Sequence, residues 1–254
     1  EALLCGEVAG PEVMATLGMV AARTDRIRLG SGIVATSTRS PVLTAMGFAS
    51  LSSMAPGRVV AGFGASSPIV VRDWHGLEFG EPVATAREFV AAFRAVIRGE
   101  KVLRSGGRFP IDGFCLSGSA PQEVRVWLAA MNDRMLRLAG EIADGGFLTW
   151  CPPSEVSAKL ELVREGAESV GRSLVDLEVV VSYWGFAGGP GDVERVRERC
   201  RRSVLAYAMV PTHQRAFVNS FPELEEARQA WEAGDRRRAL KLTSDDAVNA
   251  MCAV

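Results

Sequence analysis

The sequence predicts an α/β fold with a parallel sheet and helices outside it, and two observations support this prediction. Short apolar runs rich in β-branched residues alternate with longer segments of helical period along most of the chain. Such βαβ units build either a (β/α)8 barrel or an open, doubly wound sheet. The second observation is that no G-x-G-x-x-G motif opens a helix with an acidic residue about 20 positions later, as a doubly wound dinucleotide-binding sheet requires. We therefore favour the barrel.

The first half of the chain follows this alternation closely. We predict strands over 2–6, 26–34 and 59–63, and helices over 11–21, 41–54 and 85–98. Pro11 suits the first turn of a helix, because N–H groups in that turn make no hydrogen bond within the helix and the N–H that proline lacks is not needed there. Pro56 and Gly57 end the second helix, and Phe89 and Phe93 lie on one apolar face of the third.

The second half interrupts the alternation twice. Residues 101–118 are rich in glycine and proline with short β-like pieces, which predicts a surface hairpin. We then predict strands over 124–129, 147–150 and 177–186, and helices over 133–143, 154–170 and 192–207. Residues 211–240 have a short, polar, helical pattern that suggests an insert, and Ser244 is a helix cap before the last helix. We expect one barrel domain over 1–254, with the hairpin and the insert as excursions.

Six predicted strands are too few to close an eight-stranded barrel. The first strand–helix pair and the last βα unit are therefore expected to be absent from this chain, which begins with Glu1 rather than Met. We expect a gap, or a partner chain, between the strands at 3–6 and 179–182. The chain is then either a fragment or a shortened relative of a full barrel.

Composition excludes several classes of protein. The 254 residues carry a formal net charge of −1, which disfavours a nucleic-acid or acidic-membrane partner, and no apolar run approaches the length of a membrane span. Five cysteines without a C-x-x-C pair indicate free thiols in a reducing compartment, so we expect a cytoplasmic protein without disulfides. With only two histidines and no ligand spacing, we expect no metal site.

In a parallel barrel the functional residues lie where the strands end. The glycines around Gly32 permit either close approach of a flat ligand or a simple bend of the strand. Asn132 and Arg134 begin a helix after a strand, where N–H groups and the helix dipole favour a phosphate; an ordinary loop capped by Asn132 is the alternative. Trp150 could form a ligand platform or pack at the rim of the barrel, and His75 could be an acid–base residue or a hydrogen-bonding loop residue.

Several segments resemble the luciferase-like flavin and deazaflavin oxidoreductases, from about residue 5 to residue 208. The matching segments are RIRLGSGI at 26–33, RSP at 39–41, SSMAPGR at 52–58, GFG at 62–64, RGE at 98–100 and LAGEIADG at 138–145, with Glu88, Ala167 and Gly171-Arg172. Each motif is loose, but their order and spacing agree with the family.

The resemblance implies a barrel that holds a flavin-type ring in its C-terminal mouth. It places the ring on a backbone bulge at Gly32 and Ile33, with a distorted, cis peptide between them. The other cofactor contacts that it implies are Ala35, Ala65, Ser66, Met131, Asn132, Arg134 and Met135. Thr149, with Trp150, would contact the substrate.

Two departures from the deazaflavin sugar dehydrogenases matter for the chemistry. Those enzymes carry an acidic residue after the G-x-G strand, whereas this chain has Ser66 and Ser67 there. They also carry an Asp-His pair on an early strand, whereas this chain has only Glu7. The sugar-oxidising mechanism is therefore not transferred, and the candidate catalytic residues are Glu7, Ser67 and His75.

The function we expect is an oxidoreductase that moves a hydride between coenzyme F420 and a small organic substrate. An FMN-dependent monooxygenase of the same family is the alternative, and a non-catalytic flavin-binding or structural relative is the alternative from another class. We expect a homodimer with a small-molecule substrate and neither a nucleic-acid nor a membrane partner.

Overall fold

The structure, a computed structural model, describes residues 1–104, 106–118, 123–189 and 191–253. Contacts between residues divide the chain into two compact units. The first unit comprises 1–147 and 162–179, and the second comprises 148–161 and 180–254. The single domain that we expect from the sequence stays a prediction, and each unit is described by itself.

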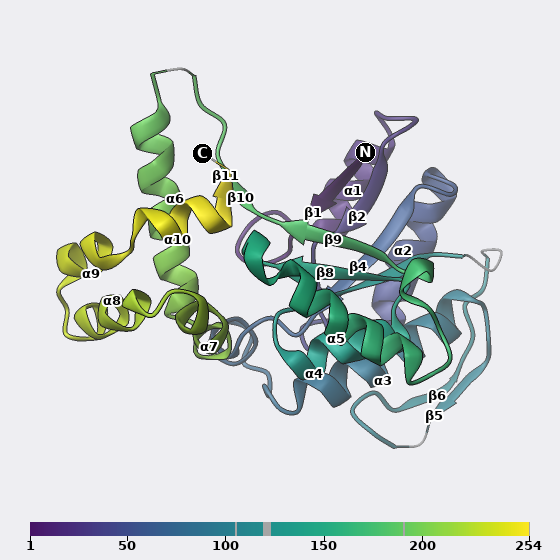
Figure 1. Cartoon of the computed structure of the whole chain (residues 1–254). Coiled ribbons are helices and arrows are strands. Elements are labelled where there is room, and N and C mark those ends of the chain that lie inside the picture. The colour runs from purple at the N-terminus through teal and green to yellow at the C-terminus, as the bar shows by residue number, and fades with distance from the viewer. Residues whose placement is uncertain (105, 119–122, 190, 254) are drawn as a thin grey trace. The chain divides into compact units, whose positions relative to one another are not determined.

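A curled sheet with parallel strand pairs is the central feature of the fold. Its strands are β1 (Ala2–Cys5), β2 (Arg28–Ser31), β3 (Val34–Ala35), β4 (Val59–Gly64), β7 (Arg125–Ala130), β8 (Gly145–Thr149) and β9 (Glu178–Ser182). They follow the order β1-β2-β4-β7-β8-β9, with β3 beside β4 (Figure 1). The pairs β1–β2, β2–β4, β3–β4 and β4–β7 are parallel. Because each strand is added beside the preceding one, without the reversal of a doubly wound sheet, the order is that of a barrel.

The path of the sheet begins at β1 and ends at β9. These are the strands between which the sequence predicts a gap. An ion pair shows how strongly the sheet curls: Arg28 at the start of β2 binds Glu178 at the start of β9 with an N–O distance of 2.6 Å. Since three strands separate β2 from β9 in the sheet, this contact requires the sheet to bend round on itself.

Helices follow the strands as predicted. They are α1 (Val13–Ala21), α2 (Pro41–Met54), α3 (Pro82–Ile97), α4 (Asp133–Ile142) and α5 (Val156–Glu168). Phe63 of β4 packs edge-on against Phe48 of α2 and against Phe89 and Phe93 of α3, with ring centroids 4.9–6.0 Å apart. All four rings are fully buried, so the apolar face predicted for α3 is the face that covers the sheet.

The hairpin predicted at 101–118 is present in the described residues. Strands β5 (Val102–Arg104) and β6 (Ile111–Phe114) pair antiparallel, outside the main sheet. Residues 105 and 119–122, which belong to or follow this segment, lie outside the described residues.

Helices dominate the second unit. They are α6 (Val193–Ala208), α7 (Pro211–Ser220), α8 (Glu223–Glu232), α9 (Arg236–Leu242) and α10 (Asp245–Met251), with a short parallel pair of β10 (Trp184–Gly185) and β11 (Cys252–Ala253). Leu205 of α6, Ala227 and Ala230 of α8 and Ala239 of α9 form a buried cluster. The predicted insert at 211–240 therefore consists of α7, α8 and most of α9. Ser244 caps α10, because its hydroxyl accepts a hydrogen bond from the Ala247 N–H at 3.1 Å.

Three differences between the predicted and observed elements have a physical reason in the structure. The strand predicted at 26–34 is broken between β2 and β3, and the strand at 177–186 is broken between β9 and β10, because β10 pairs with β11 and not with the main sheet. Helix α1 begins at Val13, not at Pro11, because the Glu12 carboxylate accepts the Ala15 N–H at 2.7 Å and so caps the helix.

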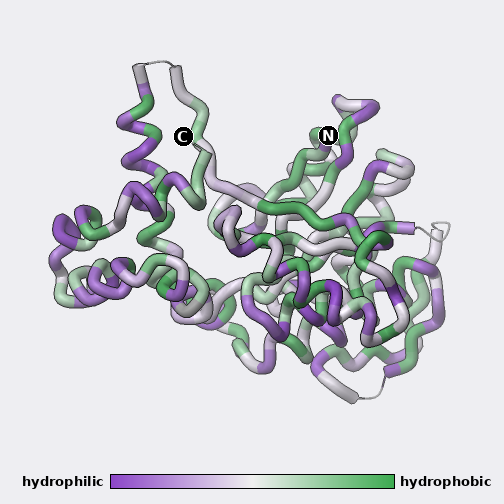
Figure 2. Tube along the Cα trace, viewed as in Figure 1, coloured by the Kyte–Doolittle hydropathy of each residue, from purple (hydrophilic) through white to green (hydrophobic). Residues whose placement is uncertain are grey.

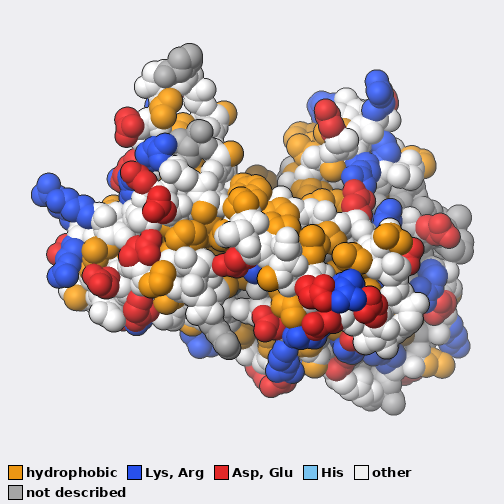
Figure 3. All heavy atoms as spheres, in the orientation of Figure 1, with side chains coloured by type: hydrophobic (Ala, Val, Ile, Leu, Met, Phe, Trp, Pro, Cys, Tyr) orange, Lys and Arg blue, Asp and Glu red, His pale blue; other side chains and the backbone are white. Residues whose placement is uncertain are grey.

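Hydropathy and charge follow this architecture. The strands of the sheet are largely hydrophobic, whereas α8 and α9 carry long hydrophilic stretches (Figure 2). Acidic and basic side chains are interspersed on the visible face, with no large area of one sign (Figure 3), which agrees with the net charge of −1.

Candidate active site

The break between β2 and β3 forms a bulge where the two strands meet. The Gly32–Ile33 peptide is cis, as the family resemblance predicts. Two hydrogen bonds join the bulge to the end of β1: the Gly32 N–H donates to the Cys5 carbonyl at 2.8 Å, and the Glu7 N–H donates to the Ile33 carbonyl at 3.1 Å. Gly32 and Ile33 are both partly exposed, so a ligand can reach this backbone.

The bulge is also anchored to β4. The buried Ser31 hydroxyl donates to the Gly62 carbonyl at 2.6 Å and accepts the Gly62 N–H at 2.9 Å. A Cβ on Gly62 would lie only 2.0 Å from the Ser31 carbonyl oxygen, so this position requires glycine. The G-x-G segment therefore has a structural reason that the sequence did not reveal: it lets the bulged strand approach β4 closely.

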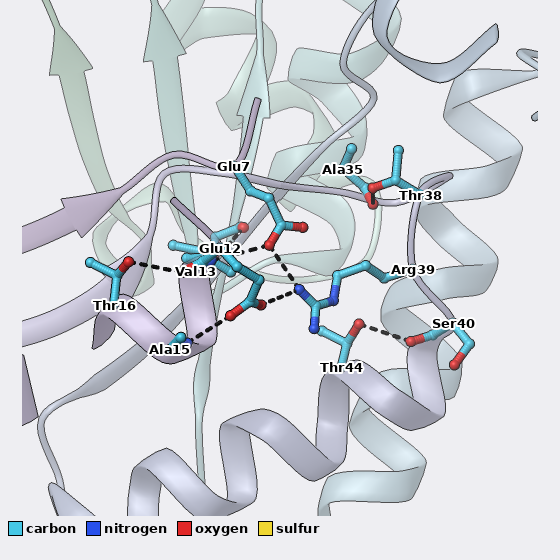
Figure 4. Close-up of polar contacts among 12 residues, drawn as sticks. Glu7, Glu12, Val13, Ala15, Thr16, Ala35, Thr38, Arg39, Ser40 and Thr44 are labelled. Atoms are coloured by element: carbon cyan, nitrogen blue, oxygen red, sulfur yellow. Dashed lines mark hydrogen bonds and ion pairs between the residues drawn. The ribbon is translucent and has the colours of Figure 1, made fainter. Parts of the chain in front are cut away.

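Glu7 lies just beyond β1, and one oxygen of its carboxylate makes two contacts (Figure 4). One oxygen accepts the Arg39 Nη1 at 2.7 Å and the Val13 N–H at 3.2 Å. The same Nη1 binds the Glu12 carboxylate at 2.5 Å. Arg39 and the first turn of α1 thus fix the position of the Glu7 carboxylate.

The pKa of Glu12 is set by opposing effects. Burial alone would raise it, but hydrogen bonds from the Ala15 N–H and from Arg39 outweigh burial, so the pKa of Glu12 lies below its ordinary value. Burial likewise disfavours charge on Arg39, and the two carboxylates more than compensate, so the pKa of Arg39 is raised. Glu12 and Arg39 therefore stay charged at neutral pH.

The segment after β4 contains three predicted site residues. Ala65 and Ser66 are partly exposed, and Ser66 has a φ of 61°, a left-handed conformation that is uncommon for a residue with a side chain. Ser67 is buried, and its hydroxyl accepts the Val70 N–H at 3.4 Å, where a π-helical turn (Ile69–Trp74) begins. His75 ends that turn and is exposed. In the part of the chain that the structure describes, no hydrogen bond or ion pair joins Glu7, Ser67 and His75 to one another.

The start of α4 follows the end of β7, as predicted. The backbone bonds of the helix begin with the N–H groups of Met135 and Leu136, which both donate to the Asn132 carbonyl at 3.0 Å. The first N–H groups of a helix have no partner within it, and the positive end of the helix dipole lies here. Arg134 is exposed in the first turn, and Met131 is partly exposed. This donor set suits an anionic group such as a phosphate.

Two predicted cofactor contacts have little exposed side chain. Ala35 is 1% exposed, and its carbonyl accepts both the Thr38 N–H and the Thr38 hydroxyl at 3.2 Å. Met135 is 8% exposed. The β2–β3 break and the turn before α2 direct Ala35 inward, so any contact of these two residues with a ligand would be made at their edges.

In the second unit, Trp150 belongs to an aromatic cluster. Its ring stacks on Trp184 with centroids 4.7 Å apart and an angle of 21°, and lies 4.8 Å from Tyr207. Tyr207 in turn stacks on His213 at 5.5 Å. Burial raises the pKa of Tyr207 and lowers that of His213 to about 4. Trp150 is therefore a packed residue of this cluster, and sequence reasoning missed its partners because Trp184 and Tyr207 are 34 and 57 positions away.

Trp150 shares a backbone feature with Ser66. In the described part of the chain, these are the two non-glycine residues with positive φ, 53° and 61°. Both follow a strand of the sheet and both were predicted as site residues. Conformations of this kind are concentrated at ligand sites, because the surrounding structure must enforce them.

Neither a metal-binding cluster nor a membrane-spanning helix is found among residues 1–104, 106–118, 123–189 and 191–253. No group of three or more His, Cys, Asp or Glu side chains is arranged to hold a metal ion, and no helix is both long and apolar enough to cross a membrane.

The curled parallel sheet, the bulge beside β4 and the helix start after β7 can now be compared with known proteins. The family model for luciferase-like monooxygenases matches residues 1–254. The chain belongs to the luciferase-like monooxygenase family. This confirms the resemblance inferred from the sequence motifs.

Two relatives are about 30% identical to this chain over the aligned residues. A 5,10-methylenetetrahydromethanopterin reductase from Methanolobus tindarius is 30% identical over 168 residues, which cover 66% of this chain and 51% of that protein. An F420-dependent glucose-6-phosphate dehydrogenase from Nakamurella multipartita is 31% identical over 176 residues, 67% of this chain and 52% of that protein. The chain thus spans about half the length of these relatives.

Two solved structures have the same fold. The coenzyme F420-dependent tetrahydromethanopterin reductase from Methanopyrus kandleri superposes with a TM-score of 0.81 at 24% identity, covering 97% of this chain and 76% of that one. An F420-dependent secondary alcohol dehydrogenase, solved with an F420–acetone adduct, gives a TM-score of 0.76 at 19% identity, covering 96% and 70%. The predicted barrel-type fold is thereby confirmed.

Proposed function

We propose that this chain is part of an oxidoreductase that transfers a hydride between coenzyme F420 and a small organic substrate. Support comes from relatives at 30% and 31% identity, one of them named as F420-dependent, and from structural neighbours of which two are named as F420-dependent. The observation that carries the proposal lies in the chain itself. The neighbouring strands β2, β4 and β7 end in small or partly exposed residues and, after β7, in a helix start suited to phosphate.

The residues present fit a flat, phosphate-bearing cofactor. Gly32, Ala65 and Ser66 offer backbone and small side chains for a ring, and Asn132 and Arg134 begin the helix that would hold the phosphate. When bound, F420 would supply the carbon that accepts or donates the hydride. The chain's own contribution is to bind and orient this group against the backbone of the bulge.

The roles of the polar residues follow from their contacts. Arg39 holds the carboxylate of Glu7 in place near the bulge, and we keep Glu7 as a candidate catalytic residue. Ser67 anchors the turn after β4, which sets the position of Ser66. His75 is exposed and is the described residue best suited to exchange a proton with solvent. We also propose Thr149 and Trp150 as substrate contacts of the second unit, whose aromatic cluster suits an apolar substrate.

Further parts of the proposal concern the protein's setting. We propose a reducing, cytoplasmic setting, which five free cysteines support, and no nucleic-acid or acidic-membrane partner, which the net charge of −1 supports. The homodimer stays a prediction from the family resemblance.

Titration of the protein with F420 tests the proposal, with cofactor absorbance and fluorescence as the signal. We expect saturable binding that Arg134→Ala weakens about ten- to hundredfold, because a charge-assisted hydrogen bond contributes about 1.5–3 kcal/mol. Arg137→Ala is the matched control: Arg137 lies on the same helix but binds Glu165 at 2.9 Å. Equal loss in both variants, or none in Arg134→Ala, would place the phosphate elsewhere. Saturable binding of reduced FMN with none of F420 would favour the monooxygenase alternative.

A further inference from the structure

We propose that Arg39 is a positioning residue that fixes the cofactor-binding bulge through Glu7. This inference rests on the proposed function for the identity of the ligand, but the contacts that carry it belong to the chain alone. Arg39 lies between β3 and α2, just before Ser40, which caps α2. Glu7 and Glu12 lie on the loop between β1 and α1. One guanidinium thus joins two loops of the first unit at the C-terminal ends of their strands (Figure 4).

The contact is made by a single nitrogen. Nη1 of Arg39 lies 2.7 Å from the Glu7 carboxylate and 2.5 Å from the Glu12 carboxylate. The side chains of Arg39 and Glu7 are only 17% and 22% exposed, whereas that of Glu12 is 47% exposed. The Arg39–Glu7 pair is therefore the shielded part of the network, and water weakens it less than it weakens the Arg39–Glu12 pair.

Glu7 passes this restraint on to the bulge. Its side chain is fixed by Arg39 and by the Val13 N–H, and its backbone N–H donates to the carbonyl of Ile33. The Gly32 N–H adds a second bond beside it, to the carbonyl of Cys5 at the end of β1. The position of the Gly32–Ile33 backbone therefore depends on where Glu7 lies, and the position of Glu7 depends on Arg39.

Charge makes this dependence strong. With Arg39 present, one positive charge balances part of two negative charges. Without it, two carboxylates that share one nitrogen would face each other and separate, which would pull Glu7 away from Ile33. A lysine could replace the arginine, because one ammonium can approach both carboxylates as Nη1 does. A pair that used two guanidinium nitrogens could not be rescued in this way.

Two measurements on the full chain test the inference: hydrogen exchange of the backbone amides without cofactor, and the dissociation constant of F420. In Arg39→Ala we expect the amides of Glu7 and Gly32 to exchange at least tenfold faster, and F420 to bind at least tenfold more weakly. Arg39→Lys should restore both values to within about threefold of the parent. Arg23→Ala is the matched control, because Arg23 is an exposed arginine just after α1 whose side chain contacts the Met19 carbonyl. It should change neither the exchange rates of these amides nor the affinity for F420.

The outcomes separate this inference from the proposed function. If the parent protein binds no F420, the proposed function fails, and the exchange experiment still decides the role of Arg39. Unchanged exchange at Glu7 and Gly32 in Arg39→Ala would overturn the inference, as would an equal increase across the whole first unit, which would show only a loss of stability. If Arg39→Ala does not fold, Glu7→Gln removes the shielded carboxylate instead, and faster exchange at Gly32 is then required.

Discussion

Acidification should destabilise the protein through His213 of α7. The imidazole stacks on Tyr207, and its Nδ1 is buried with no hydrogen-bond partner in the described part of the structure. Burial lowers the pKa of His213 from 6.5 to about 4. As the pH falls through 6.5, His213 is protonated in the unfolded chain but stays neutral in the folded chain. The free energy of unfolding therefore decreases until the pH reaches about 4, below which His213 is protonated in both states. At about 1.4 kcal/mol per pH unit, this interval is worth about 3 kcal/mol.

The assay compares the parent with His213→Gln in urea unfolding at about pH 7.5 and about pH 4.5. The parent should lose about 3 kcal/mol more than the variant between these values. The stacked Trp150 and Trp184 of the same unit give a near-ultraviolet signal for its unfolding. NMR reads the pKa directly, since the sequence has two histidines and His75→Gln assigns them. An imidazole of His213 that titrates near 6.5 in the folded protein would refute the reasoning.

Two further predictions concern packing and thiols. Gly62→Ala should lower the free energy of unfolding by about 1–3 kcal/mol, because the new Cβ would lie 2.0 Å from the Ser31 carbonyl oxygen. Gly146→Ala is the control and should cost less in thermal unfolding, because the nearest atom to its Cβ would be 3.6 Å away. Equal losses in the two variants would contradict the argument that β2 and β4 need this close approach. In the native protein iodoacetamide should modify the exposed Cys115 and spare the buried Cys252. Burial and the neighbouring thiol raise the pKa of Cys252, so little reactive thiolate is present. Mass spectrometry that finds Cys252 labelled in the folded protein would contradict this prediction.

Local sequence patterns could predict the helices and strands of the barrel because each depends on nearby residues. Helix 41–54 was predicted with its observed bounds, since Ser40 caps its first turn and Pro56 prevents its continuation. The strand at 177–186 was wrong in its second half. Its last residues pair with Cys252 and Ala253, about 70 positions later, and no local pattern encodes a partner at that distance.

The same distinction applies to the candidate site. The backbone features could be predicted from motifs: the bulge at Gly32 and the helix start at Asn132 lie where the sequence placed them. The side-chain network could not, because Arg39 and Glu7 are 32 residues apart and either could have been a solvated surface charge. The roles of Glu7, Ser67 and His75 as catalytic residues stay predictions.

The Arg28–Glu178 pair has a consequence for how the sheet keeps its curvature. Backbone hydrogen bonds hold each strand to its neighbour, but β2 and β9 are not neighbours, and side chains hold them together. These side chains are 36% and 30% exposed, so dissolved salt can compete with their attraction. We therefore expect this contact across the sheet to weaken as the ionic strength rises, while the backbone hydrogen bonds between neighbouring strands remain.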